Sequence, residues 1–390
     1  MFCVVKPAPV LLSDFGGPKR VATRPMPARD PGFDEAFDDD TLFFDGFYDR
    51  SLDKIVIVGP ALFNLASSLK LTHVRARPSG ESCRFQVREF DRHVRVVVDA
   101  PAGTHALAFT GPLGAFELIL QVSMAEPFAG THMLATMSRN NDIVWIMDWV
   151  RYHRDRHGAD AVLIYDNKTT NYDSSTMLEA LRCVGGLKAA MVVNWPFKYG
   201  PQGTLEGFWD SDFCQYGMLE HARWRFAPEA AGVMNADIDE LLVSSGREGV
   251  FDALARSRFG IVRYPGRWVV GVEGDPQVEP ARVRRHLDYH IALKPDYIYR
   301  FGLMRRDRLR CSPKWTVAPR RCPVTAQWKT HTITGWVNGR VLSPGFLFRH
   351  FREIGDSWKY DRTTRAPFDP RRHFDDVELR RTLEGIDWER

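Results

Sequence analysis

Two aspartates one residue apart, Asp237 and Asp239, directly follow an apolar stretch in GVMNADIDELLV, residues 232–243. Carboxylates at the end of a buried strand lose hydration, so they need a positive partner. Mg²⁺ and Mn²⁺ prefer hard oxygen ligands, and both ions bridge to diphosphate oxygens. The pair therefore predicts a site for a metal bound to a diphosphate. A structural pair that caps the next helix is the alternative.

The chain contains two further Asp-x-Asp pairs, and neither ends a predicted buried strand. Asp38 and Asp40 lie in an acidic segment where they are expected to be solvated. Asp210 and Asp212 are placed to cap a helix. Position in the predicted fold, and not the motif alone, therefore singles out the pair at 237 and 239.

A second polar pair, Asp166 and Asn167, ends the strand-like run AVLIYDN. A carboxylate at this place can accept hydrogen bonds from ribose hydroxyls or from the imide N–H of uracil. An Asx turn ahead of the following helix explains the same two residues. Both interpretations fit the local sequence.

Basic and histidine residues gather in the last third of the chain. The run from 300 to 321 holds Arg300, Arg305, Arg306, Arg308, Arg310, Lys314, Arg320 and Arg321. It is either a solvated basic face or an anion site, for which phosphate is the natural ligand. His331 could complete the metal site from a distant loop, and Lys314, His350 and Arg352 could neutralise a leaving diphosphate. Each histidine could equally be structural.

The elements that must position these residues alternate between strand and helix. Strands are predicted at HMLATM, AVLIYDN and AAMVVNW, and helices at residues 141–158, 173–186 and about 211–226. This alternation predicts a right-handed, parallel α/β sheet. Ligands of such sheets lie beyond the carboxyl ends of the strands, so Asp166 and Asp237 should share one edge.

The chain divides into segments of different composition. Residues 1–40 are rich in Pro, Gly and Asp and predict a mobile leader. Residues 41–125 carry short β-like runs such as KIVIVGP and HVRVVVDAPAG, which predict a small β-sandwich-like accessory domain. Residues 130–360 form the predicted catalytic domain, and 361–390 a C-terminal tail. Two units also agree with a length of 390 residues.

Composition excludes some classes of function. The net charge of +4 is spread over 53 basic and 49 acidic residues, so nucleic acid is not an expected partner. Six cysteines without a C-x-x-C pair favour free thiols in a reducing compartment, with a Cys311–Cys322 bridge as the alternative. The broken apolar N-terminus resembles neither a signal peptide nor a membrane span. We expect a cytoplasmic protein whose membrane contact, if any, is peripheral at the inner face; the oligomeric state is unspecified.

The motifs together resemble glycosyltransferases of family 2 and their family 92 relatives. TMSRNNDIVWIMDWVRYHRDRHGADAVLIYDN is followed about 70 residues later by ADIDELLV. The shared pattern is a strand, a helix ending in W-x-x-Y-H, a strand ending in Tyr-Asp-Asn, and D-x-D-E. The later KW and HFR segments resemble the basic, His-containing tail of the group. The resemblance covers roughly residues 130–360.

This resemblance implies the GT-A fold, which is Rossmann-like with a mostly parallel sheet. It implies an enzyme, for example of polysaccharide biosynthesis, that moves a sugar from a UDP- or GDP-sugar to a hydroxyl of a glycan acceptor, generally with inversion. The product, a polysaccharide, a lipid-linked glycan or a glycoprotein, is left open. Asp166 and Asn167 would contact the nucleoside, and Asp237 and Asp239 would hold Mn²⁺ or Mg²⁺ with the diphosphate. Glu240 would brace the loop or serve the acceptor side.

One departure from the family pattern concerns the donor. The usual Lys-Asn-Glu after the first strand is replaced by residues 139–142, Arg-Asn-Asn-Asp. The acid that often helps to bind the nucleotide is therefore displaced or missing, and Arg139 is the candidate nucleotide-binding residue of this segment. Glu273 or Asp275, after another strand and a Gly-rich turn, could be the base that deprotonates the acceptor. An exposed turn explains these two acids as well.

Other classes of protein fit parts of the sequence. A haloacid-dehalogenase-type phosphohydrolase also places Asp-x-Asp at a strand end, but it requires Thr or Val where Leu241 stands. A sugar nucleotidyltransferase would need a Gly-rich triphosphate loop at the first strand. A non-catalytic carbohydrate-binding protein could use the aromatic residues of the β-rich region, Phe43, Phe44, Phe47 and Tyr48. Packing on the catalytic domain is the alternative role of these side chains.

Overall fold

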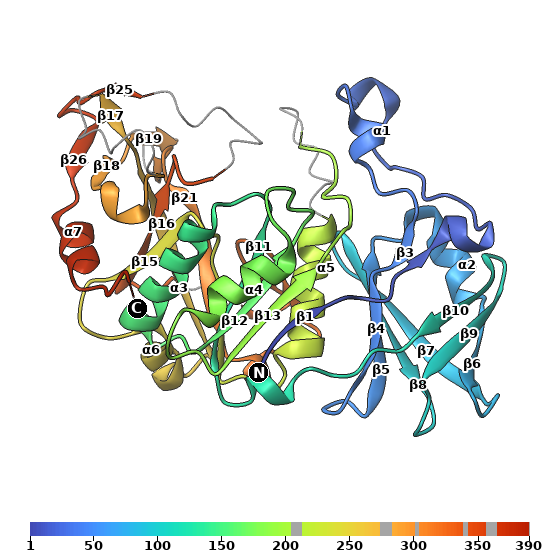
Figure 1. Cartoon of the computed structure of the whole chain (residues 1–390). Helices are drawn as coiled ribbons and strands as arrows, with labels where there is room; N and C mark the ends of the chain where they lie inside the picture. Colours follow the sequence, from blue (N-terminus) through green and yellow to red (C-terminus); the bar gives the residue numbers. More distant parts are fainter. Residues whose placement is uncertain (204–212, 274–282, 301–303, 338–341, 356–364, 390) are drawn as a thin grey trace.

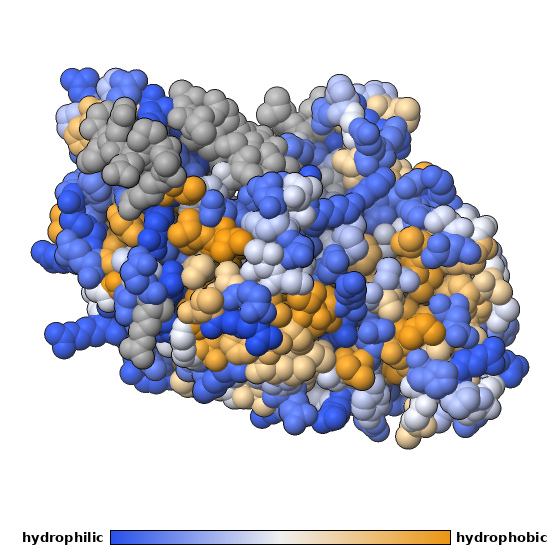
Figure 2. All heavy atoms as spheres, in the orientation of Figure 1, coloured by the Kyte–Doolittle hydropathy of each residue, from blue (hydrophilic) through white to orange (hydrophobic). Residues whose placement is uncertain are grey.

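The computed structural model describes residues 1–203, 213–273, 283–300, 304–337, 342–355 and 365–389 of the chain. It contains a larger α/β part, built around one mixed sheet, and a smaller β-rich part that packs on its side (Figure 1). On the face drawn in Figure 2, hydrophilic side chains surround separate apolar patches. No helix in these ranges is long and apolar enough to cross a lipid bilayer.

The large sheet has a parallel half and a mixed half. The parallel half runs in the order β1 (Phe2–Val5), β13 (Ala189–Asn194), β12 (Ala161–Asp166), β11 (His132–Ser138) and β14 (Gly232–Asn235). The mixed half continues the same sheet from β14 through β21 (Cys311–Val317), β16 (Ile261–Val269), β18 (Ile291–Leu293) and β26 (His373–Asp375). Off this path, β24 (Phe346–Phe351) pairs with β16 and with β15 (Glu240–Ser244).

The α/β fold class is therefore confirmed, but the sheet is wholly parallel only in its first half, and β16–β24 is a parallel pair in the mixed half. The pairs β14–β21, β16–β21, β16–β18 and β15–β24 are antiparallel. Parallel neighbours need a crossover of a dozen or more residues, which is usually a helix. Between β16 and β21 the described residues contain only short strands and one 3-10 turn, so the chain returns in antiparallel pairs.

Helices cover both faces of the parallel half. On one face, α3 (Ile143–His157) and α4 (Ser174–Arg182) pack on Val162 and Ile164 of β12. On the other face, α5 (Phe213–His221) and the π-helical turn Ala222–Phe226 pack on Leu163 and Tyr165. Because every residue of β12 is buried, this strand reads in the sequence as an unbroken apolar run.

Two more helices lie in the mixed half of the α/β part. The first, α6 (Val250–Arg256), connects β15 to β16 and packs Val250, Phe251 and Leu254 into the core. The second, α7 (Val377–Glu384), follows β26 and begins at Asp376, whose carboxylate accepts a hydrogen bond from Leu379 N–H. Arg349 of β24 donates to the same buried carboxylate and so fixes α7 to the sheet.

The β-rich part is one antiparallel sheet bent over its own core. Its strands follow the order β10 (Gly114–Ile119), β9 (Ala106–Gly111), β6 (His73–Arg77), β7 (Ser82–Glu89), β8 (His93–Asp99), β5 (Lys54–Pro60) and β4 (Asp45–Asp49). Both ends of this order contribute to a single apolar cluster, from Ile57 on β5 to Leu107 on β9. The hydrogen bonding is continuous through β7, so this part resembles a sandwich in its packing but not in its pairing.

Strand β5 joins the two parts because both of its faces are buried. Ile55 and Ile57 belong to the core of the β-rich part, whereas Val56 and Val58 belong to the cluster around α5. Of the four aromatic side chains that could have bound a glycan, Phe43, Phe44 and Phe47 are 0% exposed, whereas Tyr48 is 42% exposed. The three phenylalanines therefore serve packing. The run KIVIVGP shows no polar alternation because both faces of β5 are buried.

Buried ion pairs also cross between the two parts. Asp45 of β4 accepts hydrogen bonds from His221 Nε2, at 2.8 Å, and from the Arg225 guanidinium. The other ring nitrogen of His221 lies 2.8 Å from the hydroxyl of Tyr165 on β12. Nearby, Glu220 Oε1 accepts from Arg95 of β8, at 2.9 Å. Burial alone would raise the pKa of Glu220, but the Arg95 charge lowers it to about 2.

Two expectations about the chain outside the predicted catalytic domain need correction. Residues 1–40 are not simply a mobile leader, because β1 pairs with β13 and the Arg20 side chain is buried with three backbone carbonyl partners. Residues 361–390 are not simply a tail, because β26 and α7 belong to the α/β part. The expectation of free thiols is confirmed for all six cysteines, so the alternative of a Cys311–Cys322 bridge is not realised.

We predict that Asp45→Asn lowers the free energy of unfolding by about 3 kcal/mol or more, since it leaves the buried Arg225 without its carboxylate. The matched control is Asp99→Asn, whose partner Lys54 and own carboxylate are exposed, and which should destabilise the protein clearly less than Asp45→Asn does. Urea unfolding followed by circular dichroism measures both. Equal losses in the two variants would contradict a structural role for the buried pair.

Candidate functional site

The Asp237–Asp239 pair lies in a tight turn between β14 and β15, at the carboxyl edge of the parallel strands. Glu240 N–H donates to the Asp237 carbonyl at 3.0 Å, and Glu240 Oε2 accepts from Asp237 N–H at 2.9 Å. Ile238 and Glu240 are buried, whereas the two aspartates are partly exposed. The turn therefore presents both aspartates at the edge, and Glu240 holds it closed from beneath.

Helix α3 fastens the strand that follows the turn. The Tyr152 hydroxyl and His157 Nε2 both donate to the Leu242 carbonyl, at 2.9 and 2.6 Å. His153 Nε2 lies 3.4 Å from Leu242 N–H and accepts from it, since the other ring nitrogen faces the Trp149 carbonyl. Burial lowers the pKa of both histidines, that of His157 to about 4, so they serve as neutral rings.

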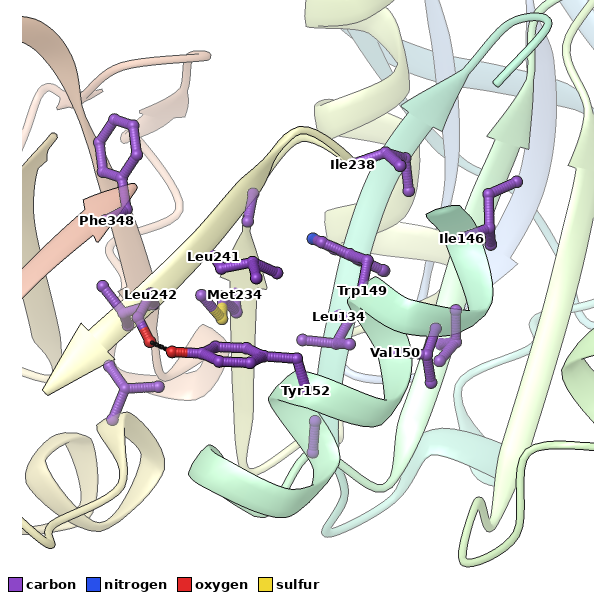
Figure 3. Close-up of a cluster of buried hydrophobic side chains, with 14 of the residues drawn as sticks. Leu134, Ile146, Trp149, Val150, Tyr152, Met234, Ile238, Leu241, Leu242 and Phe348 are labelled. Carbon is purple, nitrogen blue, oxygen red and sulfur yellow. Dashed lines mark hydrogen bonds between the residues drawn. The ribbon is translucent and has the colours of Figure 1, made fainter. Parts of the chain in front are cut away.

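The same fastening extends into the core beneath the turn. Ile238, Leu241 and Leu242 pack with Trp149 and other side chains of α3 in one apolar cluster (Figure 3). His286, which is fully buried, lies with Nε2 2.9 Å from the Ile238 carbonyl and so holds the middle residue of the Asp-x-Asp motif. Sequence reasoning missed His286, because no motif connects residue 286 with the turn at 238.

A buried ammonium group lies under the turn. Lys314 of β21 is 0% exposed, and its Nζ is 2.7 Å from Asp237 Oδ2 and 3.3 Å from Glu240 Oε2. Burial would lower the pKa of Lys314, but Asp237 and Glu240 raise it above the ordinary lysine value. Burial in turn raises the pKa of Glu240. Lys314 is therefore charged, and it is the fixed positive partner of the first aspartate.

The second aspartate faces His350 of β24. His350 Nε2 is 3.0 Å from Asp239 Oδ2, and the imidazole stacks on the indole of Trp268 with 4.0 Å between ring centroids. Glu240, His350 and Trp268 occupy directly paired positions on β15, β24 and β16, so the pairing register brings them together. Burial would lower the pKa of His350, but Asp239 raises it to about 10, helped by a hydrogen bond with Cys311.

Asp166 lies at the expected edge but its carboxylate is already engaged. β12 and β14 flank β11 in parallel, so their carboxyl ends, Asp166 and the Asp237 turn, share one edge as predicted. Asp166 Oδ1 accepts from Thr169 N–H at 3.0 Å, and Oδ2 accepts from the Ser174 hydroxyl at 2.7 Å. Both contacts are local and structural, as the turn alternative expects, although the backbone bond reaches three residues along the chain and not two. Asn167 donates to the carbonyls of Trp195 and Phe197 and so shapes the neighbouring loop.

Three other predicted site residues are exposed, and they lie at the ends of three different strands. Arg139 is exposed at the end of β11, between the ends of β12 and β14. Arg352 is exposed just beyond β24. Glu273 is exposed at the end of β17 (Val272–Glu273), which pairs with β25 (Ala366–Pro367) outside the large sheet. Asp275 lies outside the described residues.

The expected three-ligand metal set does not form. His331 is near enough for the charges of Lys314 and Asp237 to act on it, but it is exposed on the loop after β22 (Gln327–Trp328). Within the described residues, no three His, Cys, Asp or Glu side chains are grouped so that they could hold a metal ion. The histidine that faces the Asp-x-Asp turn is His350.

Comparison with known proteins finds only remote likenesses. No protein-family model matches the chain, and no curated protein matches its sequence. Core-mannan synthase A (CmsA/Ktr4) from Aspergillus fumigatus, in its Mn/GDP form, is 8% identical, with 36% of this chain and 43% of that chain covered. The mannosyltransferase Ktr4p from S. cerevisiae, in complex with GDP, is 9% identical over 40% and 44%. Both TM-scores are 0.24, so neither likeness establishes a shared fold or activity.

We predict that Lys314→Met lowers the free energy of unfolding by about 3–5 kcal/mol, because Asp237 and Glu240 lose their buried cation. Lys314→Met combined with Glu240→Gln should recover part of the loss, since one of the two unpaired acids is then neutral. Thermal and urea unfolding measure the cycle, with the exposed Lys6→Met as control. A Lys314→Met variant as stable as Lys6→Met would contradict the role of the ion pair.

The raised pKa of His350 predicts a pH dependence of stability. The folded protein holds the His350 proton up to about pH 10, whereas the unfolded chain releases it near pH 6.5. The contribution is therefore complete below about pH 6.5 and declines as pH rises toward 10. In a chelating buffer, the stability difference between the parent protein and His350→Gln should shrink from pH 6 to 9. A difference that stays constant or grows would refute the pairing with Asp239.

Proposed function

We propose that this chain is a metal-dependent glycosyltransferase that transfers a sugar from a nucleoside-diphosphate sugar to a hydroxyl of a glycan. One observation carries the proposal. Two partly exposed aspartates stand at the carboxyl edge of parallel strands, and each faces a cation from a strand far away in sequence, Lys314 or His350. This edge is where α/β sheets bind their ligands. An arrangement of acids and fixed cations suits a metal with a diphosphate.

Asp239 and His350 fit a divalent metal. The atoms Oδ2 and Nε2 are 3.0 Å apart. Neighbouring ligands of an octahedral ion, each about 2.1 Å from the metal, are also separated by about 3.0 Å. A carboxylate and an imidazole are both ligands that Mn²⁺ accepts. His350 would release its proton when a metal replaces it, and a bound metal would supply charge to neutralise the diphosphate.

The remaining residues of the cluster act by positioning. Glu240 is 2% exposed and bonded to the turn, so it holds Asp237 in place and does not reach an acceptor. Lys314 donates to the Asp237 carboxylate and fixes it from beneath. Trp268, stacked on the imidazole, and Cys311 restrict the rotation of His350. This rigidity would spare the enzyme reorganisation of its charges during transfer.

The nucleotide would lie along the edge toward β12. Arg139 is exposed between the Asp237 turn and Asp166, where its guanidinium could pair with phosphate or ribose. Each carboxylate oxygen of Asp166 accepts one bond within the turn and retains a second lone pair for a nucleoside hydroxyl. Glu273 stays the candidate base on the acceptor side, as inverting transfer requires.

Binding of metal and nucleotide tests this proposal. Mn²⁺ together with GDP or UDP should raise the melting temperature of the parent protein, by mass action on the folded state. Asp239→Asn and His350→Gln should lose this increase, whereas the exposed Asp99→Asn should keep it. The nucleotide that stabilises then guides a screen of nucleotide sugars for slow hydrolysis.

Two outcomes would reject the proposal. One is the absence of stabilisation by any nucleoside diphosphate with Mn²⁺, or equal stabilisation of Asp239→Asn. The other is the release of phosphate from simple phosphoesters without turnover of any nucleotide sugar, which would favour a phosphohydrolase.

A further inference from the structure

A cavity of about 340 Å³ lies at the base of the hairpin formed by β19 (Tyr297–Arg300) and β20 (Met304–Asp307). Its walls come from β16, from the segments that enter and leave the hairpin, and from Leu347 of β24. The volume is within the lower range of pockets that bind small organic ligands. None of the residues assigned above to the metal or the diphosphate lines it.

Positive charge dominates this cavity. Arg267, Lys294 and Arg310 line it together with a single carboxylate, Asp307. That carboxylate accepts hydrogen bonds from the backbone N–H groups of Asp296 and Leu309, each at 3.0 Å, and so holds together the two ends of the hairpin. The cavity therefore offers more cationic donors than its own acid can use.

The two arginines are available to an incoming anion. The Arg267 guanidinium lies over the ring of Phe374, at 5.3 Å, and Arg310 is exposed. Neither makes an ion pair within the part of the chain that the structure describes. A guanidinium binds carboxylate or phosphate through paired hydrogen bonds, which an ammonium group does not. Two such groups in one cavity are typical of a site for an anion with a defined orientation.

The rest of the lining is apolar and aromatic. Tyr297 is 43% exposed at the cavity, and Leu309 and Leu347 form further walls. A free inorganic anion would gain little from these surfaces, whereas a sugar ring presents C–H faces to them while its acidic group meets the arginines. The combination favours an organic anion of the size of one sugar.

The cavity is separate from the candidate donor site but shares its strands. Arg267 directly precedes Trp268, whose ring stacks on His350. Successive side chains of a strand point to opposite faces, so Arg267 lies on the face of β16 away from His350. Arg310 likewise directly precedes Cys311, which bonds to His350. The cavity thus flanks the candidate active site across two strands.

We infer that this cavity binds an anionic sugar, either a uronic acid or a phosphate-bearing residue, of the glycan acceptor. The bound sugar is part of an acceptor only under the proposed function, so the inference rests on that function. It deepens the proposal by naming an acidic glycan as the substrate class. Arg267 and Arg310 hold the acidic group, and Tyr297 with the leucines holds the ring. Arg310 is the member of the basic run after residue 300 that lines this cavity.

Calorimetry with the full chain tests the inference with three probes, a hexuronate trisaccharide, a hexose 1-phosphate and a neutral trisaccharide. At least one acidic probe should bind, and the neutral one should bind at least about tenfold more weakly. Binding of the uronate or of the phosphate identifies which acid the cavity takes. The double variant Arg267→Gln, Arg310→Gln should bind the acidic probe at least about tenfold more weakly.

The control variant Arg258→Gln, Arg320→Gln carries the same charge change on exposed residues outside the cavity and should bind normally. If the double variant does not fold, the exposed Arg310→Gln alone should show a smaller loss. Equal binding of the neutral probe, full binding by the cavity variants, or no binding of either acidic probe would overturn the inference.

The test separates this inference from the proposed function. Asp239→Asn should lose stabilisation by Mn²⁺ and nucleotide while it still binds the acidic probe. The cavity variant should keep that stabilisation and lose the probe. Failure of the nucleotide assay with retained acidic-sugar binding rejects the transferase and leaves a binding site. The reverse result rejects the cavity site alone.

Discussion

The ion pair between the buried Lys314 ammonium and Asp237 is the interaction on which the candidate site depends. A buried cation without a carboxylate is strongly destabilising, so β21 can occupy its place only when the turn after β14 is correctly formed. Glu240 then closes the turn against the same ammonium. The charge that makes the turn stable is therefore also the charge that prepares it for an anionic ligand.

This constraint explains why the mixed half of the sheet lies beside the parallel half. Asp237 and Asp239 come from the loop after β14, but their cations come from β21 and β24, which lie about 75 to 110 residues later. Antiparallel pairing of β14 with β21 and of β15 with β24 brings these residues together. On its other side, β15 is fastened to α3 through Leu242. The W-x-x-Y-H motif thus acts in positioning, since Tyr152 and His153 reach the strand and not the edge.

Local patterns in the sequence were sufficient for the elements near the site but not for their partners. The order of strands and helices, the place of Asp237 at a strand end and its shared edge with Asp166 all followed from apolar runs and caps. The choice between His331 and His350 did not, because it depends on the register of β15 with β24. His286, Trp268 and Cys311 lacked any local signal for the same reason. Strand β1 was also not predicted from the sequence. Its partner β13 lies almost 190 residues away, and a short edge strand resembles an irregular segment.

The β-rich part is connected to the candidate site through a chain of buried polar contacts. Asp45 of that part accepts from His221, whose other ring nitrogen meets the hydroxyl of Tyr165. Tyr165 directly precedes Asp166 at the edge where the nucleotide would lie. Burial lowers the pKa of His221, and the paired partners on both ring nitrogens leave its ring one orientation. Because Tyr165 is fully buried between this histidine and Trp195, the end of β12 has little freedom to move. The β-rich part, joined to the α/β part by these buried charges, therefore contributes to the rigidity of the edge itself.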